Sequence, residues 1–202
     1  MKKKETRRLT VMAMICAILI IMSTTPLGYL NIGPLAITMN MIPVAVAAMV
    51  MGWKGGAIAG GIFGITSFLQ CIGIGGVSLM GEILFDISPV LAFVQRFIPR
   101  VLAGLLCGLV FDAVRRTRLK SAAGFITGFC ASLLNTVLFM VALVVLFGNT
   151  EYLQGLIGGQ NIMLFMVTFV GVNALVEVVV VTAASGILSG ALSKARILGR
   201  EN

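Results

Sequence analysis

The stretch Phe93-Val94-Gln95-Arg96-Phe97-Ile98-Pro99-Arg100 places two arginines, four residues apart, between long apolar runs of a 202-residue chain. Hydrophobic residues make up 59% of the chain and charged residues only 11%, and the mean hydropathy is +1.09. A soluble domain is roughly half apolar and about a quarter charged, so this composition is typical of a membrane protein. A guanidinium near lipid costs several kcal/mol unless a partner compensates it, so these two arginines need an explanation.

The remaining cations stand at the ends of the apolar runs. If the chain crosses the membrane six times with both termini in the cytoplasm, thirteen of the fifteen lysines and arginines fall on the cytoplasmic side. They are Lys2, Lys3, Lys4, Arg7, Arg8, Lys54, Arg115, Arg116, Arg118, Lys120, Lys194, Arg196 and Arg200. Cytoplasmic loops are enriched in Lys and Arg, so this bias predicts the orientation and leaves Arg96 and Arg100 as the exceptions. The net charge of +8 therefore indicates topology rather than nucleic-acid binding, because no aromatic residues that stack on bases are interleaved with the cations.

The apolar runs predict an all-α membrane protein that forms one integral membrane domain. We expect a basic cytoplasmic tail at 1–8 and helices at about 9–24, 37–52, 55–74, 97–114, 121–147 and 162–193. The first run resembles the apolar region of a signal peptide, but Ser23-Thr24-Thr25-Pro26 is a poor cleavage site. We therefore expect it to remain as the first span. The second, interrupted near Pro43, is short for a bilayer of ~30 Å.

Two glycine-containing segments carry further expectations. The uncharged segment from Pro26 to Asn40 holds two prolines and two glycines, so we expect an irregular loop that folds back over the protein as a cover. In the third run, Gly56, Gly60 and Gly64 recur every four residues. Small residues at this spacing allow two membrane helices to approach closely, so we expect this face to pack against another helix.

No catalytic or cofactor motif is present in the sequence. It has no P-loop, no HExxH and no GxSxG, and it contains no histidine. The four cysteines lie singly in apolar runs, where we expect small buried thiols rather than a metal site. Asp86 and Asp112 fall on opposite sides of the predicted membrane and cannot form a catalytic pair. We therefore expect neither an enzyme nor a bound cofactor.

Polar residues inside the apolar runs are the candidate binding residues. Arg96 and Arg100 share one helix face and are suited to clamp a carboxylate or phosphate. They are equally compatible with an ion pair to Glu177 or with snorkelling to the outer headgroups. Asn135 and Asn173, deep in the last two runs, either line a pocket or bond between helices. For Glu177 we favour a structural role, neutralising an arginine or bonding a backbone group.

Three features together resemble the substrate-binding S components of energy-coupling factor (ECF) vitamin transporters. They are Ala13-Met14-Ile15-Cys16-Ala17 in the first run, the loop Pro26-Leu-Gly-Tyr29 with Ile42-Pro43, and the junction Met51-Gly-Trp-Lys-Gly-Gly-Ala57. The resemblance covers essentially the whole chain. It implies that Ala13 and Ala17 dock on a transmembrane coupling subunit and that two partner ATPases supply energy. It also implies that a small vitamin is captured at the extracellular face beneath the first loop, in the membrane of a bacterial cell.

Within this family the chain is most similar to the pantothenate type. Phe63-Gly-Ile-Thr-Ser67 and Phe93 to Leu102 carry that similarity, which implies that Arg100 and Asn135 contact the substrate. Five further residues are candidates for substrate binding: Arg96, Asn173, Gln70, Tyr29 and Asn40. Leu69-Gln70 stands where the subfamily has an aromatic residue, so a different vitamin or small anion stays open. An autonomous secondary transporter and a membrane enzyme or assembly factor are the competing classes, although no internal repeat favours the former.

Overall fold

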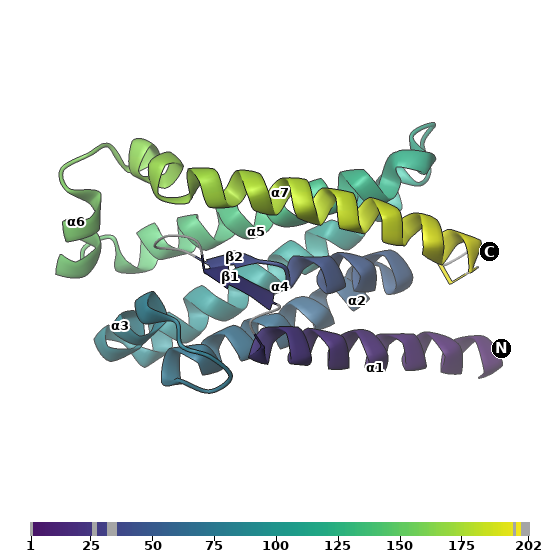
Figure 1. Ribbon diagram of the computed structural model, residues 1–202, viewed down its shortest axis with the longest axis horizontal. Coiled ribbons are helices and arrows are strands. Elements are labelled where there is room, and N and C mark those ends of the chain that lie inside the picture. The colour runs from purple at the N-terminus through teal and green to yellow at the C-terminus, as the bar shows by residue number, and fades with distance from the viewer. Residues whose placement is uncertain (1, 26–27, 32–35, 196, 199–202) are drawn as a thin grey trace.

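The computed structural model describes residues 2–25, 28–31, 36–195 and 197–198, and most of them are helical. Long helices run side by side along the longest axis of the molecule (Figure 1). The elements follow in the order α1 (Lys2–Thr24), β1 (Tyr29–Asn31), β2 (Ala36–Thr38), α2 (Met41–Leu69), η2 (Gln70–Ile72), α3 (Leu79–Ile87), α4 (Pro89–Val114), η3 (Lys120–Ala122), α5 (Ala123–Phe147), α6 (Glu151–Ile157) and α7 (Ile162–Lys194).

Helix α2 doubles back on itself at Gly52, whose φ of 68° and ψ of −158° are not helical. A Cβ atom added at Gly56 would lie 3.1 Å from the Cβ atom of Ala48. In a straight helix eight residues rise about 12 Å, so this contact requires the chain to reverse. Residues 41–51 and 53–69 are therefore two antiparallel arms, which correspond to the second and third predicted helices. Only glycine adopts such a left-handed backbone without strain, which explains the bend.

The second arm of α2 packs against α4 through its glycines. A side chain at Gly56 would collide with the carbonyl oxygen of Gly104, and one at Gly60 with that of Arg100. At Gly64 it would lie 2.9 Å from the Cα atom of Phe97. This close backbone approach confirms the packing role predicted for the three glycines. It also fixes the position of the α4 segment that carries the two arginines.

Helix α4 begins at Pro89, eight residues before the predicted start near Phe97, so that prediction is wrong. The side-chain oxygen of Ser88 caps the helix by accepting from the Leu91 backbone N–H, and Pro89 occupies the first turn. Proline is favoured there because its missing N–H has no partner to lose. The predicted start near Phe97 lies well inside α4. Arg96 and Arg100 thus belong to the helix interior rather than to its mouth.

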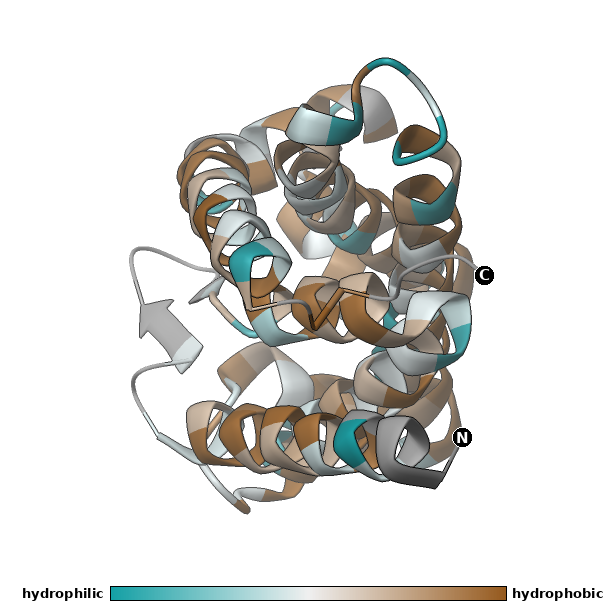
Figure 2. Ribbon diagram, turned by 90° about the vertical axis from the view of Figure 1, so that its right-hand side faces the viewer, coloured by the Kyte–Doolittle hydropathy of each residue, from teal (hydrophilic) through white to brown (hydrophobic). Residues whose placement is uncertain are grey.

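Short elements occupy two of the connections between the long helices. The segment before α2 contains β1 and β2, which pair antiparallel with Tyr29 opposite Thr38. This hairpin lies on the flank of the bundle between α1 and α7 (Figures 1 and 2). The connection between α5 and α7 holds α6. The strands correct the expectation of an irregular loop, and a backbone bond from Met39 N–H to the Gly28 carbonyl oxygen (2.9 Å) closes the hairpin at its base.

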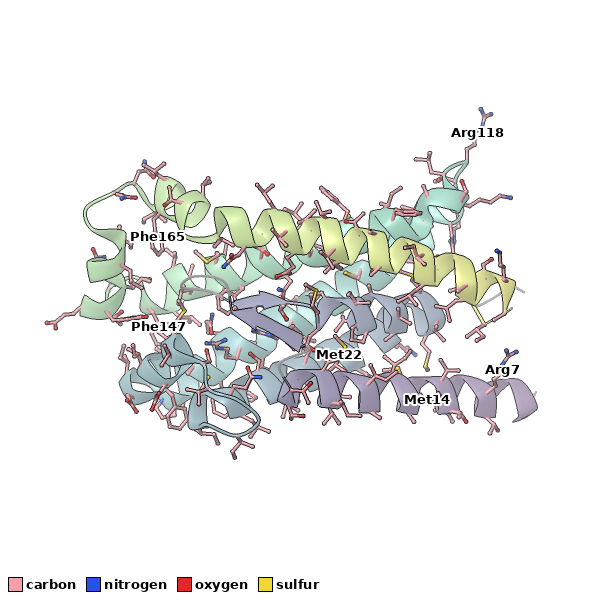
Figure 3. The ribbon with its side chains drawn as sticks, in the orientation of Figure 1. Arg7, Met14, Met22, Arg118, Phe147 and Phe165 are labelled. Atoms are coloured by element: carbon pink, nitrogen blue, oxygen red, sulfur yellow. The ribbon has the colours of Figure 1, made fainter. Side chains whose placement is uncertain are left out.

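One end of the bundle gathers the termini, while α3 and α6 lie at the other end (Figure 1). The guanidinium of Arg7 donates to the carbonyl oxygen of Ala195 over 3.1 Å, which joins the two terminal helices. The bend at Gly52 lies beside Asp112 near the end of α4, and Asp112 pairs with Arg115 at 3.0 Å. Figure 3 shows Arg7 and Arg118 at this same end. The cation clusters therefore share one end, as the charge pattern predicted.

The helices of the bundle are coloured mostly as hydrophobic (Figure 2), and many large hydrophobic side chains are exposed. In the described part of the chain, four helices are long and apolar enough to cross a membrane, namely Met41–Ile72, Pro89–Val114, Lys120–Phe147 and Asn173–Lys194, and Leu9–Thr24 is a shorter apolar helix. Large hydrophobic side chains face outward, including Leu175 and Ile187 of α7, each 69% exposed. Such a surface suits lipid rather than water, so the chain is a multi-pass membrane protein.

Candidate functional site

Arg96 and Arg100 lie one turn apart inside the bundle and are only 7% and 5% exposed. This burial rules out snorkelling to the headgroups. The Nη2 atom of Arg96 donates to Ser78 Oγ at 3.1 Å, and its Nη1 atom donates to Ser67 Oγ at 3.5 Å. The Nη1 atom of Arg100 donates to the Arg96 carbonyl oxygen at 2.7 Å. Both guanidinium groups are thus held in place by neutral oxygen atoms of α2, α4 and the cap of α3.

Aromatic rings lie against both guanidinium groups. The guanidinium carbon of Arg100 lies 4.7 Å from the ring centre of Phe63 on α2 and 5.3 Å from that of Phe139 on α5. That of Arg96 lies 5.4 Å from the same Phe139 ring. Cation–π contacts of this kind stabilise a desolvated charge without neutralising it. The arrangement keeps two positive charges in a low-dielectric interior, where they attract an anion strongly.

A second cluster of polar residues surrounds Glu177, whose side chain is 5% exposed. Its Oε1 atom accepts from Ser132 Oγ on α5 at 3.0 Å, and its Oε2 atom accepts from the Thr38 backbone N–H on β2 at 3.2 Å. The Asn135 side chain also bonds to this carboxylate, and Arg100 lies within electrostatic range of it. This confirms the expectation that Glu177 bonds a backbone group. It also ties the β1–β2 hairpin to α7.

Several buried polar atoms have no hydrogen-bond partner within the described ranges. Asn40 and Gln95 are each 0% exposed, and neither end of either amide is paired. The Oδ1 atom of Asn135 and the Oγ1 atom of Thr38 are likewise unpaired. A buried polar atom left unpaired costs about 1–3 kcal/mol. Thr38 and Asn135 both bond to Glu177, so a polar ligand beside that carboxylate would supply the bonds missing there.

The structure brings together three of the predicted binding residues directly. Arg96 and Arg100 meet on the ring of Phe139, and Asn135 lies one turn before Phe139 on α5. Asn40 follows β2 two residues after Thr38, so it stands at the base of the hairpin that contacts Glu177. These residues come from α4, α5, α7 and β2, together with Asn40 just before α2, and the glycine contacts described above hold α2 against α4.

The other three candidates lie elsewhere or are only partly described. Gln70 in η2 uses its amide nitrogen to donate to the Ser23 carbonyl oxygen at 2.7 Å, which ties η2 to the end of α1. Asn173 is half-buried on α7, one turn before Glu177. Tyr29 belongs to β1, and its side chain lies outside the described residues.

The sequence analysis missed five residues of this region: Thr38, Ser78, Gln95, Ser132 and Phe139. Gln95 stands beside Arg96 in the stretch from Phe93 to Arg100, and an uncharged polar side chain within an apolar run could have identified it. Phe139 and Ser132 stand four residues after and three before Asn135, on the same side of a helix. Thr38 is recognised only from the fold, because its backbone rather than its side chain binds Glu177.

The small residues of α1 lie on its outer face. Ala13 and Ala17 are exposed, whereas Met12, Ile15 and Leu19 are buried in the core. Ala13 and Ala17 therefore do not pack within the bundle.

Comparison with known proteins identifies the family. The family model described as "ECF transporter, substrate-specific component" matches residues 7–188. The pantothenic acid transporter PanT of Lactococcus lactis is 28% identical, over 97% of this chain and 98% of its own length. The pantothenate transporter PanT of Leuconostoc mesenteroides is also 28% identical, over 98% of this chain and 100% of its own length. The chain therefore belongs to the family of substrate-specific components of ECF transporters.

Proposed function

We propose that this chain captures pantothenate, or a closely related small acid, at the extracellular face of a bacterial cell membrane for import. Two full-length relatives are pantothenate transporters by name. The observation that carries the proposal is the buried pair Arg96 and Arg100, which share the ring of Phe139 one turn after Asn135. A different vitamin or small anion is the alternative ligand.

Pantothenate has a chemistry that matches this region. It carries one carboxylate, one amide and two hydroxyl groups on a short carbon chain. A guanidinium can receive a carboxylate through two parallel hydrogen bonds, which gives both strength and orientation. The amides of Asn40 and Asn135 can bond the neutral polar groups, and the rings of Phe63 and Phe139 can pack against the carbon chain. We infer that the β1–β2 hairpin, which is bonded to Glu177 through Thr38, covers the bound ligand.

The proposed topology has six spans, with both termini in the cytoplasm. The α1 helix, the two arms of α2, and helices α4, α5 and α7 supply the spans, and the first arm of α2 crosses only part of the bilayer. The cation clusters at one end support this orientation, because Lys and Arg favour the cytoplasmic side. The end with α3 and α6 then faces outward.

Transport itself would depend on partner subunits. We propose that a transmembrane coupling subunit docks on the Ala13 and Ala17 face of α1 and that two ATPase subunits supply the energy. Small side chains on an exposed helix face allow a second helix to approach closely. In this scheme the chain binds and releases its ligand and catalyses no reaction.

The proposal is tested by ligand binding to the purified chain in detergent without ATP. Isothermal titration and thermal melting against a panel of vitamins should show saturable binding of pantothenate and a raised melting temperature, because a ligand stabilises the state that it binds. If no member of the panel binds, the proposed function is wrong. Proton- or sodium-driven uptake into vesicles that lack any ATPase would instead indicate an autonomous transporter.

Enlarging Ala13 should abolish assembly while leaving ligand binding intact. We expect Ala13→Leu to fold and bind pantothenate as the wild type does, because the side chain points outward. Co-purification with the coupling and ATPase subunits should be lost. Ala183→Leu is the matched control, since Ala183 is an exposed alanine on α7. Normal assembly of the Ala13 variant, or its loss in both variants, would argue against docking at this face.

Replacing Gln95 by leucine should raise the melting temperature of the ligand-free protein and weaken its binding of pantothenate. Removing an unpaired buried amide while keeping the side-chain volume relieves a cost of about 1–3 kcal/mol, so the ligand-free protein should melt at a higher temperature. If the amide meets the ligand, pantothenate binding should weaken by about tenfold. Gln160→Leu, at an exposed position before α7, is the control and should change neither quantity. Unchanged affinity in the Gln95 variant would remove this residue from the site.

A further inference from the structure

The surroundings of Glu177 offer hydrogen-bonding capacity that the fold does not use. Thr38 and Asn135 both bond to the Glu177 carboxylate, the first through its backbone and the second through its side chain. Yet Thr38 Oγ1 and Asn135 Oδ1 find no partner among the residues that the structure places. These side chains are 7% and 6% exposed. Both atoms are buried and unpaired, and both residues bond to the same carboxylate, so a ligand hydroxyl group there would gain hydrogen bonds that the fold does not supply.

This site differs in charge from the arginine pair, and α5 connects the two. Phe139 lies against both guanidinium groups, and Asn135 stands four residues earlier, about 6 Å along the helix axis. At the Phe139 level the interior is cationic and donates hydrogen bonds. At the Asn135 level it holds a carboxylate and an amide oxygen, which accept them. A ligand that spans one helical turn therefore meets two opposite chemistries.

We propose that Thr38, Asn135 and Glu177 form an acceptor site that takes the hydroxyl end of the ligand, so that the ligand lies with its carboxylate toward Arg96 and Arg100. This assignment rests on the proposed function and names the substrate class: small acids that carry hydroxyl groups a few bonds away from the carboxylate. Acids of equal length without hydroxyl groups are selected against at this end of the site.

Charge and donor capacity both determine this orientation. A ligand carboxylate placed beside Glu177 would face a like charge in a low-dielectric interior, which is strongly unfavourable. A hydroxyl group there can donate to Asn135 Oδ1 and also accept from the Thr38 hydroxyl, so both unpaired atoms gain a bond. The reverse orientation would leave these atoms unpaired and would bring hydroxyl groups rather than an anion to the two cations.

The test compares three ligands against matched variants of the full chain. The ligands are pantothenate, pantothenol, in which the carboxylate is replaced by an alcohol, and N-(3,3-dimethylbutanoyl)-β-alanine, which is pantothenate without its two hydroxyl groups. The variants are Thr38→Val, which keeps the backbone N–H that Glu177 accepts, and Asn135→Leu, which keeps the side-chain volume. Thr127→Val on α5 is the control, because Thr127 is also fully buried but bonds to the Ala123 carbonyl oxygen. Dissociation constants are measured by isothermal titration, and melting temperatures report folding.

Each variant of the acceptor site should raise the dissociation constants of pantothenate and pantothenol by a similar factor of about ten, because both ligands carry the hydroxyl groups. The compound without hydroxyl groups should bind wild type more weakly than pantothenate does and should lose less than twofold in the variants. Thr127→Val should bind all three ligands as wild type does.

Two results would overturn the assignment in distinguishable ways. The variants could reduce the affinity for the compound without hydroxyl groups as much as that for pantothenate, or reduce neither affinity. In both cases the acceptor site does not bind the hydroxyl groups. That result leaves the proposed function standing. If wild type binds none of the three ligands, the proposed function is wrong and the acceptor site falls with it. A variant that no longer folds is identified by its melting curve, and the other variant then decides the question.

Discussion

Gly56→Val should prevent the second arm of α2 from packing on α4. A side chain at this position meets the Gly104 carbonyl oxygen, and the Ala48 side chain of the first arm lies on another side. Because a backbone carbonyl cannot rotate away as a flexible side chain can, the helices must separate. Overpacking commonly costs about 1–3 kcal/mol, and a collision with backbone places this variant at about 3 kcal/mol or more. We expect little folded protein after detergent extraction, measured by size-exclusion chromatography and thermal melting.

Gly190→Val supplies the control for this prediction. Gly190 lies in α7, and a Cβ atom there meets no other atom within 4 Å. Both variants replace a helical glycine by the same branched residue, so the intrinsic effect on helix formation is shared. Only the packing differs. A normal melting temperature for Gly56→Val, or an equal loss in both variants, would show that the approach of α2 to α4 does not stabilise the fold.

The sequence was most informative where a single local property decides the structure. Cation clusters, apolar runs and glycine spacing predicted which segments share an end of the bundle and which faces pack. They did not predict that α4 begins at Pro89, because the two arginines and Pro99 interrupt the apolar pattern inside a continuous helix. The hairpin of β1 and β2 was also missed. Three-residue strands carry too little periodicity to be recognised, and their pairing depends on contacts made by α7.

The candidate site shows the same division. Arg96, Arg100 and Asn135 were recognised because polar residues inside apolar runs are costly and therefore informative. Their convergence could not be read from the sequence, since it depends on Phe139 reaching both cations from another helix. Thr38 contributes a backbone N–H, which every residue except proline has, so no sequence pattern could single it out. Gln95 is the missed residue that the sequence could have identified, because it is a polar residue within an apolar run.

Arg100→Gln should reduce the affinity for pantothenate by about a hundredfold while leaving pantothenol nearly unaffected. Arg100 is 5% exposed, and its charge is surrounded by Phe63 and Phe139 rather than by water. A charged hydrogen bond is worth about 1.5–3 kcal/mol, and a low-dielectric setting places this one at the upper end. Pantothenol carries no negative charge, so it gains little from the arginine and loses little with it. Isothermal titration of both ligands measures the difference.

Lysine at position 100 distinguishes charge from geometry. Arg100→Lys keeps the positive charge but loses the planar fork that binds a carboxylate through two parallel bonds, so we expect a loss of about tenfold, between wild type and the glutamine variant. Arg118→Gln, at the exposed end of the bundle, removes one positive charge far from the site and should bind both ligands as wild type does (Figure 3). Equal losses for the acid and the alcohol in Arg100→Gln would mean that this arginine maintains the site without contacting the carboxylate. In that case Arg96 alone would bind the ligand carboxylate.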